Sequence, residues 1–334
     1  MPSLSTALRT PAGTLAILGG LGLCALAAIV LALAVGSVPV DLAAIARGLA
    51  GGTDTGAAIV RDLRLPRALA AFATGGLLAV AGAMMQVLLR NPLADPYVLG
   101  ISGGAAAGAL AAMLAGLTAA ATPAAFGGAL ASTLIVFGLA RAGGERTPWT
   151  ATRLLLTGVV VAAGWGALIA LMLSLAPDAQ VKGMLFWLIG DLSAVSLAWP
   201  ALVTLGVVLA VALPFARDLN VLARGEDTAA ALGVAVPRVT LVLYALAALA
   251  TAAAVTTAGS VGFVGLVVPH ALRLVVGNDQ RLLLPASALA GGALLALADT
   301  LARSVVAPTQ LPVGVITALI GVPVFLFLLG RGRA

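Results

Sequence analysis

The sequence predicts an all-α integral membrane protein folded as a single bundle of ten transmembrane helices. Of its 334 residues, 62% are hydrophobic and only 9% are charged, whereas about a quarter of the residues in a soluble domain are charged. Apolar runs of about 20 residues, long enough to cross a hydrocarbon core about 30 Å thick, recur from end to end. No polar stretch is long enough to bury a core of its own, so residues 1–334 are expected to form one transmembrane domain.

Ten predicted spans follow one another along the chain. The first follows a short segment whose only basic side chain is Arg9. Its apolar run is longer than the roughly 7 to 15 residues of a signal-peptide core, so we expect an uncleaved helix. The eighth span is the weakest, because glycines and Pro269 interrupt it. The ten spans lie at 14–36, 68–89, 97–118, 121–140, 153–175, 199–216, 238–258, 261–276, 282–303 and 313–329.

Charged residues in the loops predict the orientation. Twelve of the 18 basic residues fall on the face that carries both termini, Arg9, Arg146 and Arg333 among them. The positive-inside rule therefore places both termini in the cytoplasm and the loop 37–67 outside. The same rule accounts for the net charge of +6 without a nucleic-acid partner.

Small residues recur at helical spacing within the spans. Gly75, Ala79 and Ala83 lie four apart on the second span. Such rows let helix backbones approach closely where lipid supplies no hydrophobic drive for association. We expect close helix packing there rather than a pore lining.

Several kinds of chemistry are excluded by what the sequence lacks. One cysteine and one histidine provide no cluster of ligands for a metal. The only lysine, Lys182, lies in an outer loop, so no phosphate-binding Gly-Lys-Ser/Thr loop exists and the chain is not expected to hydrolyse ATP. Acidic side chains lie in loops or at span ends, not at mid-membrane where ion sites are found. An energy source outside the chain is therefore favoured.

Basic residues gather at the outer end of the second span, against the positive-inside rule. Arg61, Arg64 and Arg67 are spaced three apart, so they share one face of a helix or an extended turn. They either extend toward lipid headgroups or dock an acidic partner, since arginine suits bidentate pairing with carboxylates. Arg303 is a candidate for the same surface. Asp299, four residues earlier, could pair with Arg303 in a structural role.

The inner end of the second span leads into a turn broken by prolines. Asn91-Pro92 and Asp95-Pro96 both interrupt the helix. This is either a plain turn between helices or irregular backbone that lines a cavity or meets another protein.

The inner loop 217–237 is more than a connector. Short amphipathic turns flank Arg224-Gly225-Glu226-Asp227, and Gly233 has the character of a helix C-cap. Two short surface helices indicate a docking platform for a protein. A helix lying on lipid is the alternative, but Glu226 and Asp227 would be disfavoured beside anionic headgroups.

Two blocks of sequence resemble a known family. Arg64-Leu65-Pro66-Arg67, Gln86 and the run 91–96 form the first block, and the run 262–270 with Arg273 forms the start of the second. The second block continues through Asp299, Arg303, Leu311-Pro312-Val313-Gly314 and the run 321–325. Together they resemble the membrane permease subunits of ABC importers for ferric siderophores, haem and cobalamin.

The resemblance implies an assembly in the bacterial inner membrane. The chain would pair with a second copy of itself around a central path. Two cytoplasmic ATP-binding subunits would carry ATP and Mg²⁺, so no cofactor is expected in this chain. A periplasmic substrate-binding protein would dock outside.

The resemblance also implies three groups of functional residues. Arg64, Arg67 and Arg303 match the arginines that meet acidic residues of the binding protein. Asn91, Leu93, Ala151 and Thr152 match a cytoplasmic gate, although the family has a hydroxyl where Ala151 stands. The segment Arg224, Gly225, Glu226 and Asp227 matches the coupling loop for the ATPase.

Two other classes of protein stay open on the residues alone. An ion-coupled secondary transporter would fit the hydropathy, but it would need buried charges near mid-membrane. A membrane enzyme acting on lipid-linked substrates would need convergent acid, base or metal groups at one face. The cargo is left undecided among haem, ferric siderophore and cobalamin, with an iron chelate favoured by family frequency.

Overall fold

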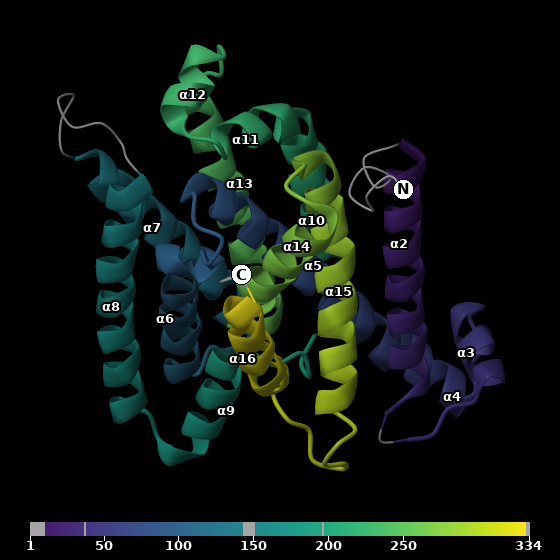
Figure 1. Ribbon diagram of the computed structural model, residues 1–334. Helices are drawn as coiled ribbons and strands as arrows, with labels where there is room; N and C mark the ends of the chain where they lie inside the picture. Colours follow the sequence, from purple (N-terminus) through teal and green to yellow (C-terminus); the bar gives the residue numbers. More distant parts are fainter. Residues whose placement is uncertain (1–10, 37, 143–150, 196, 332–334) are drawn as a thin grey trace.

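The computed structural model describes residues 11–36, 38–142, 151–195 and 197–331, which form helices and turns without a strand. Most helices run side by side through one bundle (Figure 1). Short turns of other helix types are η1 (Ile59–Arg64), η2 (Pro96–Leu99), η3 (Thr118–Ala120) and η4 (Leu213–Phe215). The α-helices are α2 (Pro11–Ala34), α3 (Leu42–Leu49), α4 (Thr55–Ala58), α5 (Leu65–Leu88), α6 (Ile101–Leu114), α7 (Ala121–Arg141), α8 (Ala151–Leu175), α9 (Asp178–Ile189), α10 (Trp199–Ala212), α11 (Ala216–Leu222), α12 (Glu226–Ala231), α13 (Val236–Ala258), α14 (Val264–Val276), α15 (Gln280–Ala302) and α16 (Val313–Arg331).

Eight helical segments in the described ranges are long and apolar enough to cross a membrane. They are Pro11–Ala34, Thr55–Leu88, Thr118–Arg141, Thr152–Leu175, Trp199–Leu222, Val236–Ala258, Gln280–Ala302 and Val313–Gly330. The predicted number of ten is therefore not confirmed.

The other two predicted spans are shorter helices. The span predicted at 97–118 contains α6, which has 14 residues, and the one at 261–276 contains α14, which has 13. At 1.5 Å per residue each is about 20 Å long, less than a hydrocarbon core of about 30 Å. Gly100 at φ +72° delays the start of α6, and Pro269 lies inside α14, as the interrupted sequence predicted.

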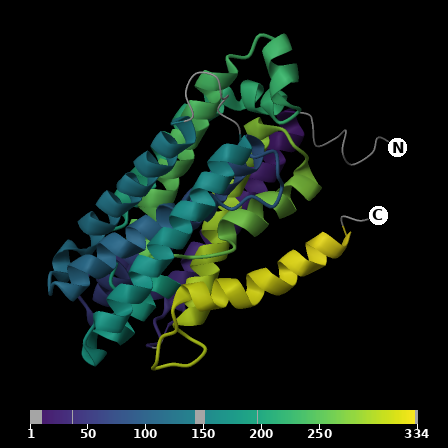
Figure 2. The same cartoon turned by 90° about the vertical axis from the view of Figure 1, so that its left-hand side faces the viewer.

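The bundle has two distinct ends (Figure 1). We call the end that carries α11 and α12 the α11 end, and the opposite end, with α3 and α4, the α3 end. The first turn of α2 lies at the α11 end. Figure 2 shows α16, in yellow, diverging from the other helices toward its C-terminal end. Three residues counted in predicting the orientation, Arg9, Arg146 and Arg333, lie outside the described residues.

Helix α5 occupies the centre of the bundle. Every residue from 73 to 88 is buried, and α5 packs against α15, α13, α14 and α10. Its glycines make this packing possible. A Cβ built on Gly75 would overlap the carbonyl oxygen of Gly291 on α15, and a Cβ on Gly82 would overlap that of Gly265 on α14. The predicted close packing of small residues is thus present on α5, where backbone meets backbone.

We expect Gly82→Ala to lower the free energy of unfolding by about 1 to 3 kcal/mol, because the added methyl group meets backbone that cannot turn aside. The thermal unfolding midpoint of the purified protein in detergent measures this effect. Gly22→Ala in α2 is the matched control, since a Cβ there has nothing within 4 Å. Equal midpoints for the two variants would contradict the packing argument.

Candidate functional site

The structure brings the three predicted docking arginines together at the α3 end, but it buries them. Arg64 ends η1, Arg67 lies in the first turn of α5, and Arg303 follows the last residue of α15. Their exposed fractions are 5%, 9% and 7%. All three line a cavity of about 260 Å³ together with Gly36 and Gln310.

Arg64 caps the end of α2. Its Nη1 donates to the carbonyl oxygens of Leu33 and Ala34 at 2.7 and 2.8 Å, and its Nη2 donates to the carbonyl of Val38. The last carbonyls of a helix have no partner within the helix and carry the negative end of its dipole. A guanidinium is therefore well placed there. The role was not foreseen, because nothing in the sequence pairs position 64 with the end of the first span.

Asp299 is the centre of the cluster. Its carboxylate accepts two hydrogen bonds from Arg67 Nε, at 2.9 and 3.1 Å, and one from Nη2 at 2.8 Å. The remaining Nη1 of Arg67 donates to Gln310 Oε1 at 2.7 Å. Asp299 is only 2% exposed. This pair fastens the start of α5 to the end of α15 and to the loop that follows it.

The predicted pair between Arg303 and Asp299 is present but is the weaker one. Arg303 Nε lies 3.9 Å from Asp299 Oδ2, and Arg303 Nη2 donates to the carbonyl oxygen of Ala32. Four-residue spacing revealed this contact. The stronger partner, Arg67, lies 232 residues away in the sequence, where spacing carries no information.

The arginine cluster carries more positive than negative charge. Three guanidinium groups line the cavity, whereas the one carboxylate, Asp299, pairs with two of them, Arg67 and Arg303. The Nε of Arg303 is buried without a hydrogen-bond partner among the described residues. A cavity with this surplus favours an anionic group, since charge-assisted hydrogen bonds to arginine are among the strongest.

The candidate gate turn lies between α5 and α6. Asn91 Oδ1 accepts the backbone N–H of Leu93 at 2.9 Å, and both side chains are exposed. Asp95 Oδ1 accepts the N–H of Tyr97 at 2.8 Å and so starts η2. Burial raises the pKa of Asp95 to about 6, against the opposing effect of that hydrogen bond. The Tyr97 hydroxyl donates to the carbonyl of Val261 at 3.0 Å, which ties the turn to the loop before α14.

The second candidate gate segment begins α8. Thr152 is exposed in the first turn, and the side chain of Ala151 lies outside the described residues. Further along α8, a Cβ on Gly158 would meet the carbonyl of Val98 in η2, so the two backbones touch. The turn that carries Asn91 and Leu93 therefore leads directly into η2, which packs against α8.

The predicted coupling segment forms two short helices, α11 and α12, that project from the α11 end (Figure 1). Gly225 joins them at φ +126°, a conformation that other residues rarely adopt, and Gly233 follows α12 at φ +80° as the predicted C-cap. Arg224 and Asp227 are exposed. Glu226 Oε1 accepts from Arg90 Nη2 at 3.4 Å, so the gate turn and the coupling segment touch each other.

We expect Asp299→Asn to lower the free energy of unfolding by about 3 kcal/mol, because it leaves buried guanidinium groups without their carboxylate. Thermal unfolding in detergent measures the change. Asp54→Asn is the control, since Asp54 pairs with Arg47 at an exposed site and asparagine keeps its role as the cap of α4. A loss of stability no larger than that of the control would show that the cluster does not hold the bundle together.

Comparison with known proteins places the chain in a family. Residues 24–331 match the FecCD transport family. The chain is 46% identical to the cobalamin import system permease protein BtuC of Halobacterium salinarum over 84% of its length and 75% of the relative's. It is 40% identical to the hemin transport system permease protein HmuU of Yersinia pestis, covering 81% of this chain and 83% of that one.

Further relatives agree with this result. The Fe(3+) dicitrate transport system permease protein FecD of Escherichia coli is 39% identical, over 82% of this chain and 86% of the relative. A solved structure described as an inward-facing conformation of a metal-chelate type ABC transporter superposes with a TM-score of 0.82 at 28% identity, covering 95% of this chain and 99% of that one. Fold, sequence motifs and relatives agree, and the chain belongs to the FecCD transport family of membrane permeases.

Proposed function

We propose that the chain is the permease subunit of an ATP-driven importer. Its cargo is an iron chelate, either haem or a ferric siderophore, or cobalamin, and it moves from the periplasm to the cytoplasm. The observation that carries this proposal is the similarity, over most of the chain, to relatives named for cobalamin, hemin and Fe(3+) dicitrate transport.

The proposed importer needs partners. A second copy of the chain completes the path, and two ATP-binding subunits bind and hydrolyse ATP with Mg²⁺. The helices α8 and α16 are apolar and largely exposed, which suits contact with lipid and with a second copy. A periplasmic binding protein delivers the cargo.

The proposed orientation follows from the distribution of basic residues. The chain lies in the bacterial inner membrane with the α11 end and both termini in the cytoplasm. The α3 end then faces the periplasm. The gate residues Asn91, Leu93, Ala151 and Thr152 control release into the cytoplasm from the same end as the coupling segment.

The surplus positive charge of the arginine cluster supports docking of an acidic binding protein at the α3 end. The three arginines are also part of the bundle's packing, so a loss of binding in one variant is ambiguous. Two substitutions that remove opposite charges from the same cluster resolve this ambiguity.

We expect Arg303→Gln to weaken binding-protein affinity about tenfold and to reduce its dependence on salt, because one charge-assisted contact is lost. Asp299→Asn is the matched variant, since it also weakens packing yet leaves the cluster more positive. Affinity is measured for the permease in nanodiscs, with the unfolding midpoint of each variant alongside. If both variants lose affinity in step with their stability, the cluster is structural and does not dock the partner.

The projecting α11 and α12 support a contact with the ATP-binding subunit, and Gly225 fixes the angle between them. We expect Gly225→Pro to abolish co-purification with that subunit, because proline cannot adopt φ +126°. Gly51→Pro is the control, since Gly51 has φ +87° but belongs to the α3 end. Normal assembly of the Gly225 variant, or equal loss in both, would count against the assignment.

The proposed function as a whole is tested by ATP hydrolysis in the reconstituted complex. We expect cargo-loaded binding protein to stimulate hydrolysis for one of haem, ferric siderophore and cobalamin. Transport driven by an ion gradient without the ATP-binding subunit would instead identify a secondary transporter.

A further inference from the structure

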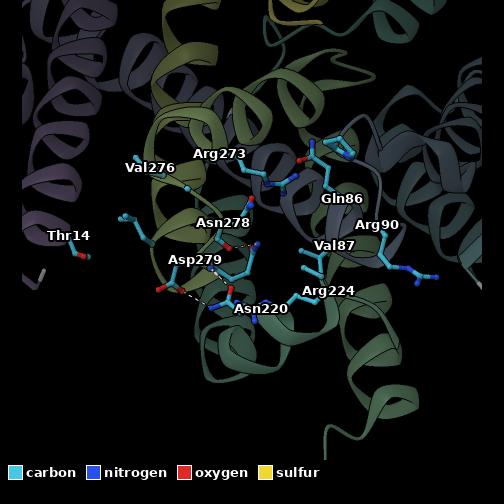
Figure 3. A pocket seen from close by; sticks show the side chains of 15 residues that line it. Thr14, Gln86, Val87, Arg90, Asn220, Arg224, Arg273, Val276, Asn278 and Asp279 are labelled. Carbon is cyan, nitrogen blue, oxygen red and sulfur yellow. Dashed lines mark hydrogen bonds between the residues drawn. The ribbon is translucent and has the colours of Figure 1, made fainter. Parts of the chain in front are cut away.

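A second and larger cavity opens at the α11 end. Its volume is about 830 Å³, and it lies between the last turn of α5, α11 and the junction of α14 with α15. Thr14 in the first turn of α2 forms its side wall (Figure 3). None of the roles described so far accounts for a cavity of this size.

The cavity is lined by more positive than negative charge. Arg90, Arg224 and Arg273 contribute three guanidinium groups, and Asp279 contributes the one carboxylate. That carboxylate is already engaged. Asp279 Oδ1 accepts from Asn220 Nδ2 at 2.8 Å and from the backbone N–H of Arg281 at 3.1 Å. Arg90 pairs with Glu226, which does not line the cavity, at 3.4 Å. Among the described residues, Arg224 and Arg273 are therefore the two of these guanidinium groups without a carboxylate partner.

Arg273 is the group most in need of a partner. It extends from the last turn of α14 into the cavity, on the side of Gln86 (Figure 3). The side chain is half-buried, and within the described ranges no hydrogen bond or ion pair involves its guanidinium. Partial burial without a counter-ion is unfavourable for a cation, so an anion bound here would be stabilised.

Two buried glutamines also line this cavity. Gln86 is 3% exposed and Gln280 1% exposed. Their amide nitrogens donate to the carbonyls of Leu266 and Asn278, at 3.2 and 3.4 Å. Each Oε1 is buried and has no partner among the described residues. Because both oxygens are closed off from solvent, the arginines and not the glutamines supply the groups that a ligand in the cavity would meet.

The surface beside Arg273 is apolar. Leu274 and Val275 follow it directly and are exposed, and Leu15, next to Thr14 on α2, is exposed as well. A soluble phosphate would gain nothing from these side chains. A phospholipid would be stabilised by them, because its acyl chains cover the apolar surface while its headgroup contacts the arginines.

We propose that this cavity binds the headgroup of an anionic phospholipid such as phosphatidylglycerol. The phosphate meets Arg273 and Arg90. The lipid belongs to the cytoplasmic leaflet, an assignment that rests on the orientation given under the proposed function. The bound lipid would join α2 and α14 to the coupling segment through Arg224.

Native mass spectrometry of the purified permease in a mixture of phosphatidylglycerol and phosphatidylcholine tests this proposal. We expect wild-type protein to retain phosphatidylglycerol preferentially, and Arg273→Gln to lower this retention about tenfold through loss of a charged hydrogen-bond donor. Arg238→Gln is the matched control, because Arg238 is exposed on the same end of the bundle but does not line the cavity. Its retention should equal that of wild type.

A second variant and a competition experiment distinguish the possible ligands. Arg90→Gln repeats the test at a side chain that is 46% exposed, in case the Arg273 variant fails to fold. It should lower lipid retention severalfold. Displacement of the lipid by millimolar inorganic phosphate would assign the cavity to a soluble anion and overturn the lipid. Unchanged retention in the variants, with loss of ATPase co-purification, would assign it to the protein partner instead. Because lipid retention itself is measured without ATPase, binding protein or cargo, its result is independent of the proposed import.

Discussion

Contact between helix backbones is the constraint on which the rest of this structure depends. Lipid tails are as apolar as leucine, so helices within a membrane gain little by hiding apolar side chains from it. The bundle instead relies on surfaces that fit without side chains between them. Gly75 and Gly82 place the backbone of α5 directly against α15 and α14. Once these contacts are made, the position of α5 fixes both candidate functional regions, because one lies at each of its ends.

Guanidinium groups that are shielded from water near the two ends of α5 are compensated in different ways. At the α3 end, Arg67 is neutralised within the protein by Asp299, and Arg64 is satisfied by the carbonyls that end α2. At the α11 end, Arg273 has no such acceptor among the residues that the structure describes. The first end is therefore mostly satisfied within the chain and contributes to stability, and its surplus positive charge remains at Arg303. The second end leaves a cation without a partner in the described part of the chain, so a bound anion would complete it.

Much of this could be predicted from the sequence, because local patterns determine it. Hydropathy located the helices, glycine spacing indicated the close packing of α5, and the charges and Gly233 indicated α11 and α12. Two predicted spans are shorter helices in the structure. Hydropathy does not detect that Gly100, at φ +72°, delays the start of α6, whereas the glycines before α14 had already marked that span as the weakest. The burial of the arginine cluster was missed for a different reason. Its partners come from the ends of α2 and α15, and only tertiary packing brings these together.

The pair between Arg67 and Asp299 also constrains how the chain is made. Its members lie 232 residues apart. At a synthesis rate of about 5 to 20 residues per second, roughly 10 to 50 s pass between their emergence from the ribosome. During that interval α5, which carries Arg67, has been synthesised, but Asp299 on α15 has not. The arginine must remain at the water-facing boundary or be shielded by the insertion machinery, so the bundle closes around α5 only after nearly the whole chain has entered the membrane.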